Sequence, residues 1–239
     1  MIRPTLFVCV LVAAASVTPL SADDPLDSEF NPASGSIESV LSKATGGVTD
    51  IRHSVDPGQG APTVSFALTS NPAPDLAPRI AIEADGRTGV TWWRDGAVDT
   101  VYARTRDAAT QTWTAETAVS DPTVDARNPE IVSDGTDLWV AFEADAGGGD
   151  TAVQVRAIRD DPDPIVMIAP YVSFGGDLDT LIHFAEGDLW VTWVDSGSEV
   201  GWSTHDAATD TWSVPGYESY ANDSIEDARA RVRSTVHGN

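Results

Sequence analysis

Residues 80–92 read IAIEADGRTGVTW, residues 131–142 read IVSDGTDLWVAF, and residues 182–193 read IHFAEGDLWVTW. Each segment opens with isoleucine, turns at an acidic residue followed by glycine, and ends with valine, a small residue and an aromatic residue. The copies recur about every 50 residues. A repeat of this length, built from short apolar runs and tight turns, is typical of a β-propeller blade, because helical repeats show a 3.6-residue apolar period instead. The sequence therefore predicts an all-β, propeller-like array of four-stranded blades.

The repeats divide the chain into four parts. We expect a secretory signal at 1–22, a polar arm or linker at 23–50, the repeat domain at 51–220, and a short helix with a tail at 221–239. In the signal, Arg3 precedes an apolar stretch that is shorter than the roughly 20 residues needed to span a membrane. The arm has room for at most one short helix, at 37–44, and Ser224 can cap the C-terminal helix.

The number of blades is close to the minimum for a ring. Three full blades are predicted at about 77–126, 127–176 and 177–220. Two further strand candidates, 51–55 and 63–69, resemble the outer half of a blade whose inner half is absent. About three and a half to four blades result, whereas a closed propeller has at least four. Unrepeated segments or a second copy of the chain could supply the missing strands. Alternatively, the blades could form an open arc whose exposed sheet edges are covered by the N-terminal arm and the C-terminal helix.

Charge excludes two classes of partner. The chain has 37 acidic and 14 basic residues, a net charge of −23, and Lys43 is its only lysine. This charge repels nucleic acid and anionic membranes, so neither is an expected partner. The composition fits a protein adapted to high salt, or equally a codon bias that disfavours lysine. Cys9 lies inside the signal, so the processed chain is expected to contain no disulfide.

A second repeat links the first and third full blades. Residues 106–113 read RDAATQTW and residues 205–212 read HDAATDTW, 99 positions later. In such a turn the aspartate can hold backbone amides while the tryptophan packs beneath the hairpin. These segments and the strand order resemble sialidase-type propeller repeats (BNR, or Asp-box), and the segments are also similar to the end of a kelch repeat. The resemblance covers about 77–215, although Ala109 and Ala208 stand in the region of the Asp-box glycine and the kelch Gly-Gly is missing.

The resemblance implies a search for the sialidase machinery, which combines three arginines, a Tyr-Glu pair and an acid. Arg79 starts one blade, but the other two full blades have no arginine at the matching position. Glu218 with Tyr217 or Tyr220 lies at the end of the repeats without a defined partner. We therefore predict no catalytic residue.

A group of acidic residues on one rim of the predicted propeller is the one feature that suggests a ligand-binding or metal-binding site. In a propeller the loops between the second and third strands of each blade share a rim with the loops that join successive blades. Here the former carry three acidic pairs: Asp95 and Asp99, Asp145 and Asp150, and Asp195 and Glu199. Such oxygen-rich loops can hold Ca²⁺ or a cationic ligand, or they simply solvate a strongly acidic protein that has no cofactor. Trp93 and Trp202 either stack on a ligand such as a sugar or fill space between blades.

The sequence favours an exported, secreted or periplasmic, non-enzymatic binding or scaffold protein with a ligand or protein partner at the acidic rim. One alternative is a degenerate sialidase-like or glycosidase-like protein that binds or hydrolyses carbohydrate. Another is a structural subunit that completes a ring as a homo-oligomer. We expect no membrane insertion after processing.

Overall fold

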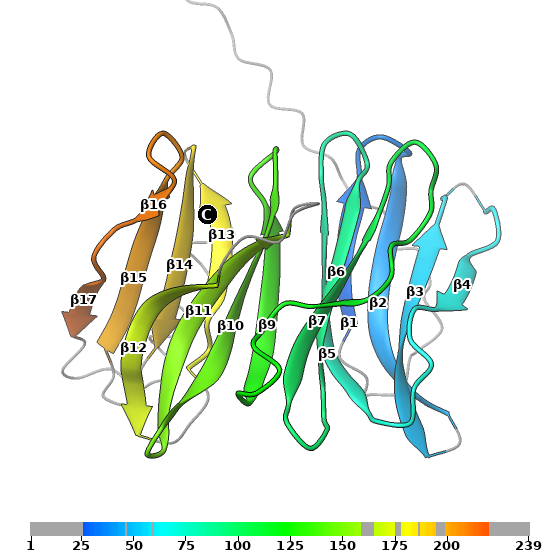
Figure 1. Cartoon of the computed structure of the whole chain (residues 1–239). Coiled ribbons are helices and arrows are strands. Elements are labelled where there is room, and N and C mark those ends of the chain that lie inside the picture. Colours follow the sequence, from blue (N-terminus) through cyan, green and yellow to red (C-terminus); the bar gives the residue numbers. More distant parts are fainter. Residues whose placement is uncertain are drawn as a thin grey trace, which may run out of the picture.

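The computed structural model describes residues 26–45, 47–58, 60–158, 165–174, 178–185, 187–194 and 199–219. The secondary-structure elements of these residues are all β-strands. They form four antiparallel sheets that follow one another in the order of the chain (Figure 1). The all-β, bladed fold predicted from the repeats is therefore confirmed. The expected signal at 1–22 and the expected helix at 221–239 lie outside the described residues.

Each sheet is built from one continuous stretch of chain. The first contains β1 (Leu26–Asn31), β2 (Ser36–Thr45), β3 (Val48–Asp56) and β4 (Val64–Ala67). The second contains β5 (Asp75–Ile82), β6 (Thr88–Arg94), β7 (Thr100–Arg106) and β8 (Thr117–Ala118). The third contains β9 (Ala126–Ser133), β10 (Leu138–Gly147), β11 (Asp150–Ile158) and β12 (Val166–Phe174). The fourth contains β13 (Leu181–Ala185), β14 (Asp188–Val194), β15 (Glu199–Asp206), β16 (Thr211–Trp212) and β17 (Gly216–Ser219), and both β16 and β17 pair with β15.

The first sheet corrects two expectations. Residues 26–31 and 36–45, expected to be part of a polar arm with a short helix at 37–44, form strands β1 and β2. They supply the inner half of the blade that the sequence reading left incomplete, so the described residues contain four blades. The expectation failed because several side chains that these strands bury are polar: Asn31, Ser36, Glu38 and Ser42. An apolar alternation, which is the usual signal of a half-buried strand, is therefore weak there.

The repeated acid-glycine turns join the first and second strands of the later blades as predicted. Gly86, Gly135 and Gly187 have φ angles of 93°, 92° and 94°, which lie in the left-handed region. Glycine enters this region without the steric penalty that a Cβ atom brings. The same backbone conformation at three equivalent positions shows that the repeat encodes one local structure.

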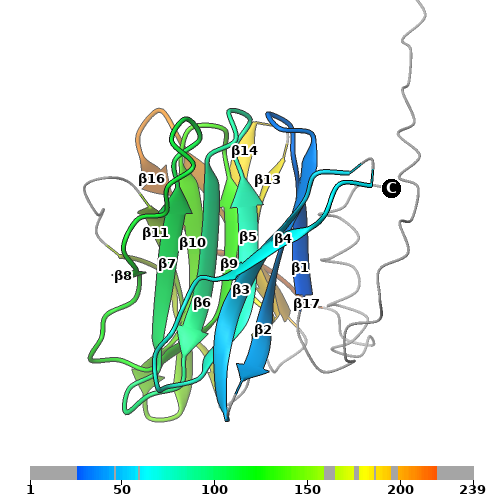
Figure 2. The ribbon, with the colours of Figure 1, turned by 90° about the vertical axis from the view of Figure 1, so that its right-hand side faces the viewer.

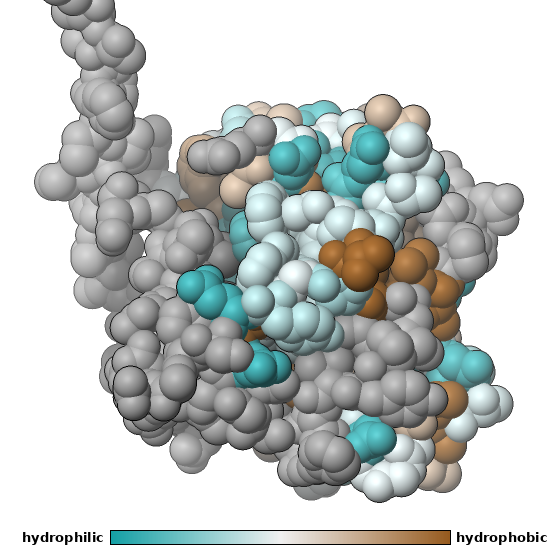
Figure 3. Space-filling view, turned by 90° about the vertical axis from the view of Figure 1, so that its left-hand side faces the viewer, coloured by the Kyte–Doolittle hydropathy of each residue, from teal (hydrophilic) through white to brown (hydrophobic). Residues whose placement is uncertain are grey.

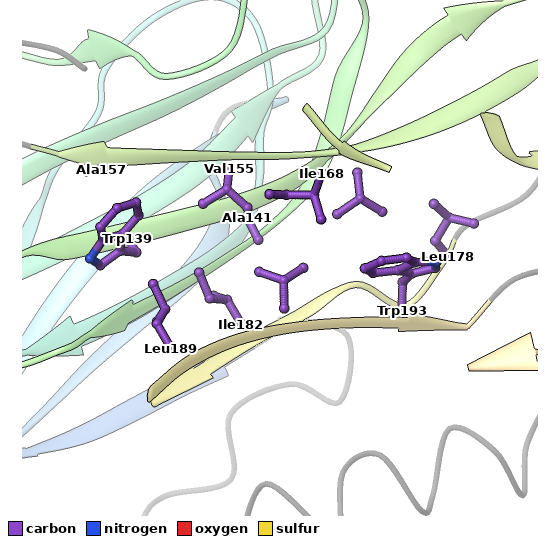
Figure 4. Packing of buried hydrophobic residues seen from close by; sticks show 11 residues of the cluster. Trp139, Ala141, Val155, Ala157, Ile168, Leu178, Ile182, Leu189 and Trp193 are labelled. Carbon is purple, nitrogen blue, oxygen red and sulfur yellow. The ribbon is translucent and has the colours of Figure 1, made fainter. Parts of the chain in front are cut away.

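Three apolar layers lie between successive sheets. The valines of the repeat, Val90, Val140 and Val191, are fully buried, one in each layer. The layer between the third and fourth sheets contains Trp139 and Trp193, which lie among aliphatic side chains from both sheets (Figure 4). Burial of apolar area of this kind is the main stabilising term for such a fold.

Neighbouring sheets pack through their first strands. Strand β5 packs against both β1 and β9, and β9 packs against β13. The first sheet lies at the right and the fourth at the left of Figure 1, and Figure 2 shows the first sheet from its own side. Among the described residues, no strand of the fourth sheet packs extensively on the first. On the side of the fourth sheet, Val214 is highly exposed, and the space-filling view shows small hydrophobic patches among polar residues (Figure 3).

The aspartate turn of the second sheet works as its sequence predicts. Oδ1 of Asp107 accepts hydrogen bonds from the backbone amides of Ala109 (3.1 Å) and Thr110 (2.7 Å), and from the Thr110 hydroxyl (2.7 Å). The bonds from Thr110 lower the pKa of Asp107. Trp113 then packs against the first sheet, with its ring centroid 5.3 Å from that of His53.

The fourth sheet repeats this arrangement. Oδ1 of Asp206 accepts a 2.8 Å hydrogen bond from the amide of Ala208, and Trp212 packs edge-on against Trp139 of the third sheet. The tryptophan of each turn thus contacts the preceding sheet.

Candidate functional site

A hollow of about 350 Å³ opens on the predicted rim, at the third sheet. It lies where the connection from the second sheet, the end of β10 and the start of β11 come together. Its lining consists of Asp125, Arg127, Glu143, Ala144, Asp145, Gly149, Asp150 and Thr151. We call this feature the rim hollow.

The second sheet fixes one wall of the rim hollow through Asp99. The Asp99 carboxylate is almost fully buried and accepts a 2.6 Å hydrogen bond from Nε of Arg127. Its backbone amide donates to Oδ1 of Asp125 (2.8 Å), and the amide of Ala126 donates to the Asp99 carbonyl (2.8 Å). The amide of Asp145 in turn donates to the Asp125 carbonyl (2.8 Å). These bonds join the second and third sheets at the rim.

Glu143 forms the floor of the rim hollow. Only 5% of this residue is exposed, and its carboxylate accepts hydrogen bonds from Nδ2 of Asn128 (3.0 Å) and from the backbone amide of Thr180 (3.3 Å). Burying a carboxylate is costly unless hydrogen bonds compensate it, and these two donors supply that compensation. Equivalent positions of the other two full blades hold Trp93 and Val194, so Glu143 is the one charged residue at this place in the repeat.

The charge of the rim hollow is strongly negative. Four carboxylates line it, whereas Arg127, its one guanidinium, forms an ion pair with Asp99. An anionic group entering the hollow would meet net repulsion, while a cation or a neutral ligand with several hydroxyl groups would find hydrogen-bond acceptors.

Two of the residues predicted at the rim lie in this hollow. Asp145 and Asp150 line it, and Asp99 lies beside it with Oδ1 accepting from the amide of Gly96 and Oδ2 from Arg127. Within the residues that the structure describes, no group of three or more His, Cys, Asp or Glu side chains is arranged to hold a metal ion. Calcium at this rim therefore stays a prediction from the sequence.

The other predicted acids are spread along the rim. Asp95 is exposed, and its backbone amide donates to the carbonyl of Pro74 (2.9 Å). Glu199 is half-buried at the start of β15, in the next sheet. Asp195 lies outside the described residues. The structure thus does not join all six acids into one cluster.

Both predicted tryptophans are half-buried against protein groups. The Trp93 ring packs on the apolar layer between the second and third sheets, with the Arg127 guanidinium 5.5 Å from its centroid. Trp202 lies on β15 across from Gly216 of β17, at a position where a Cβ atom on that glycine would overlap the indole ring. Arg127, rather than Trp93, is the side chain that lines the rim hollow.

Three charged lining residues were missed from the sequence: Asp125, Arg127 and Glu143. Asp125 belongs to the loop between the second and third blades and Arg127 to the start of β9, which follows that loop; this loop shares the rim with the loops we considered. Glu143 had a clear signal, because a charge replaces an apolar residue at one position of an otherwise apolar repeat.

The residues considered for sialidase chemistry lie elsewhere. Nε of Arg79 donates to Oε1 of Glu130 (2.8 Å), which joins the inner strands of the second and third sheets. Tyr217 and Glu218 are exposed on β17, the additional strand of the fourth sheet. Neither group lines the rim hollow.

Comparison of the whole chain with known proteins supports the fold. No family model matches the sequence, and no curated protein matches it. Among solved structures, Trypanosoma rangeli sialidase in complex with sialic acid aligns with a TM-score of 0.53 at 10% identity, over 79% of this chain and 36% of the sialidase. An α-L-arabinofuranosidase from Clostridium thermocellum aligns with a TM-score of 0.50 at 9% identity, over 80% of this chain and 71% of that enzyme. An α-L-arabinofuranosidase from Lactobacillus brevis gives a TM-score of 0.50 at 12% identity, over 79% and 70%.

These similarities define the class of fold. The chain has a sialidase-like β-propeller fold, which it shares with two kinds of glycosidase, and it spans little more than a third of the sialidase. At 9–12% identity the similarity shows the fold alone. The described residues contain no helix long and apolar enough to cross a membrane.

Proposed function

We propose that the protein is an exported, non-enzymatic propeller-like binding protein whose ligand occupies the rim hollow. The observation that carries this proposal is the hollow itself: a concave site of ligand size in which the buried carboxylate of Glu143 and three further acids converge. Concave sites with a few convergent polar groups are the usual places for small ligands.

Charge narrows the ligand to neutral carbohydrate or to a cationic molecule. Carboxylates bind sugar hydroxyl groups well, because each oxygen accepts hydrogen bonds and none donates. A sialic acid, whose own carboxylate is negative, fits poorly, because Arg127 already pairs with Asp99. The structural similarity to an α-L-arabinofuranosidase makes a neutral sugar the first ligand to test.

The second candidate is a degenerate glycosidase that still hydrolyses carbohydrate. Its support is the presence of several carboxyl groups in one hollow, since most glycosidases use a pair of them as acid and as base or nucleophile. Binding is favoured because Glu143 is held by Asn128 and by the amide of Thr180, contacts that stabilise its charged form and oppose a role as a proton donor.

Calorimetric titration of residues 23–239 with neutral arabino- and xylo-oligosaccharides, a sialoside, a polyamine and Ca²⁺ tests the site. We expect binding of a neutral or cationic ligand. The double variant Asp145→Asn, Asp150→Asn should weaken it at least about tenfold, which corresponds to the loss of about one charge-assisted hydrogen bond. Asp188→Asn is the matched control, because Asp188 is an exposed aspartate at the start of β14, beside the turn at the opposite rim.

Two results would overturn the proposal. One is equal binding by the double variant and the control, which would move the site elsewhere. The other is release of reducing sugar from an aryl arabinoside at a rate that Glu143→Gln abolishes, which would establish the glycosidase. Tight binding of the sialoside would contradict the charge argument.

A further inference from the structure

A second polar cluster lies far from the rim hollow, between the first and second sheets. Glu38 of β2 is buried, and its carboxylate accepts hydrogen bonds from Nδ2 of Asn31 (2.6 Å) and Nη2 of Arg106 (2.5 Å), while Nε2 of His53 lies 2.8 Å from Oε2. Arg106 also donates to the hydroxyl of Thr88 (2.9 Å). The network joins strands from both sheets.

Three nitrogen atoms of this cluster are buried without a hydrogen-bond partner. They are Nδ1 of His53, Nε of Arg106 and Nε1 of Trp113. The ring centroids of His53 and Trp113 are 5.3 Å apart, and Cζ of Arg106 lies 5.7 Å from the Trp113 ring. His53 contacts Glu38 through Nε2 and Arg106 contacts it through Nη2, so Nδ1 of His53 and Nε of Arg106 are not used by Glu38. Nε of Arg106 and Nε1 of Trp113 are donors, and buried donors normally have acceptors, so these two beside the unpaired Nδ1 of His53 point to a missing partner.

We propose that His53, Arg106 and Trp113 form a buried site for one small monovalent anion of the halide class. Nε–H of Arg106 and Nε1–H of Trp113 donate in every protonation state, and Nδ1–H of His53 donates when the imidazole carries two protons. This site is separate from the rim hollow and does not depend on the proposed function.

The charge balance of the cluster links halide binding to the protonation state of His53. Glu38 contributes one negative charge and Arg106 one positive charge; protonated His53 adds a second positive charge, which a bound halide neutralises. With neutral His53 the halide would leave one uncompensated negative charge in a buried place, which is costly. Among the described residues that contact His53, Phe66 and Trp113 are uncharged and Glu38 is the one ionised partner. Binding of a halide together with a proton therefore keeps the cluster neutral, so halide affinity should rise as the pH falls.

The fourth sheet offers a matched comparison. Its turn has the same sequence pattern, with His205 at the place of Arg106 and Trp212 at the place of Trp113. There the Trp139 ring lies 4.7 Å from His205 and 6.0 Å from Trp212 between centroids, and Nε2 of His205 binds Asp210. A large apolar ring thus occupies that cluster, and Trp212→Phe becomes the control for Trp113→Phe.

The direct test is anomalous diffraction from crystals soaked in sodium bromide at about pH 5.5. We expect a bromide peak within hydrogen-bonding distance of the three nitrogens. In solution, thermal unfolding in sodium bromide is compared with sodium gluconate at equal ionic strength, because screening of the −23 net charge stabilises the protein in both salts. The bromide-specific gain should be larger at pH 5.5 than at pH 8. Trp113→Phe should weaken apparent bromide affinity about tenfold, and Trp212→Phe should leave it unchanged.

An ordered water without anomalous signal at the three nitrogens would overturn the proposal. So would a bromide effect that is the same at both pH values, or one that Trp113→Phe and Trp212→Phe alter equally. The diffraction result stands even if a variant fails to fold, because it uses the unmodified protein.

Discussion

Replacement of Glu38 by glutamine should remove most of the acid sensitivity of the interface between the first two sheets. Burial alone would raise the pKa of Glu38, but the hydrogen bonds from His53, Asn31 and Arg106 outweigh burial and lower the pKa from 4.5 to about 2. Since one pKa unit corresponds to about 1.4 kcal/mol, this difference stabilises the native state by roughly 3 kcal/mol at neutral pH. Removing one partner of a buried ion pair typically costs about 3–5 kcal/mol, which agrees.

The sign of the pH dependence follows from the lowered pKa. The unfolded chain takes up the Glu38 proton near pH 4.5 and the folded protein only near pH 2, so the stabilisation is complete above pH 4.5 and is lost between these values. Urea denaturation in halide-free buffer, followed by tryptophan fluorescence from pH 7 to pH 2.5, measures it. The difference in unfolding free energy between wild type and Glu38→Gln should be about 3 kcal/mol at pH 7 and should shrink steadily below pH 4.5. A difference that stays constant across this range would refute the assigned network.

Two further experiments test the packing and the turns. Gly201→Ala places a Cβ atom inside the space of the fully buried Trp193 ring, so it should lower the unfolding free energy by about 1–3 kcal/mol in urea denaturation. Gly96→Ala should cost less, because its Cβ atom would meet the backbone of Val98 no closer than 3.3 Å. Asp107→Ala removes the acceptor of the turn amides, so hydrogen exchange at the Thr110 amide should become faster; unchanged protection there would mean that the carboxylate does not hold the turn.

The part of the fold that could be predicted is the part encoded by apolar repetition. Ile80, Ile131 and Ile182 lie on the first strands of three successive sheets, and all three are buried. Their spacing therefore revealed the blades, and the acid-glycine pairs revealed the turns. These signals are local, because each depends on residues close together in the chain.

The first blade could not be recognised in the same way, because polar groups hold it. Glu38 and Asn31 look like surface residues in a sequence, and they are buried only because Arg106, nearly 70 residues later, supplies a compensating charge. The rim hollow is similar: Glu143 depends on Asn128 and on the amide of Thr180. Glu38 and Arg106 are 68 residues apart and Glu143 and Thr180 are 37 apart, so no short window of the sequence contains both members of either pair. The acidic loops could therefore be predicted to share a rim, but not which of them enclose a hollow.

Each of the four sheets comes from one uninterrupted stretch of chain, and this determines how the protein can come apart. No described strand from one end of the chain completes a sheet at the other end, and among the described residues neighbouring sheets pack on one another at three interfaces. The molecule then behaves as a short linear array, whose stability is a sum over units and nearest-neighbour contacts. Loss of the fourth sheet breaks one interface, whereas loss of the third breaks two, so local opening should begin at a terminal sheet while the two central ones remain folded.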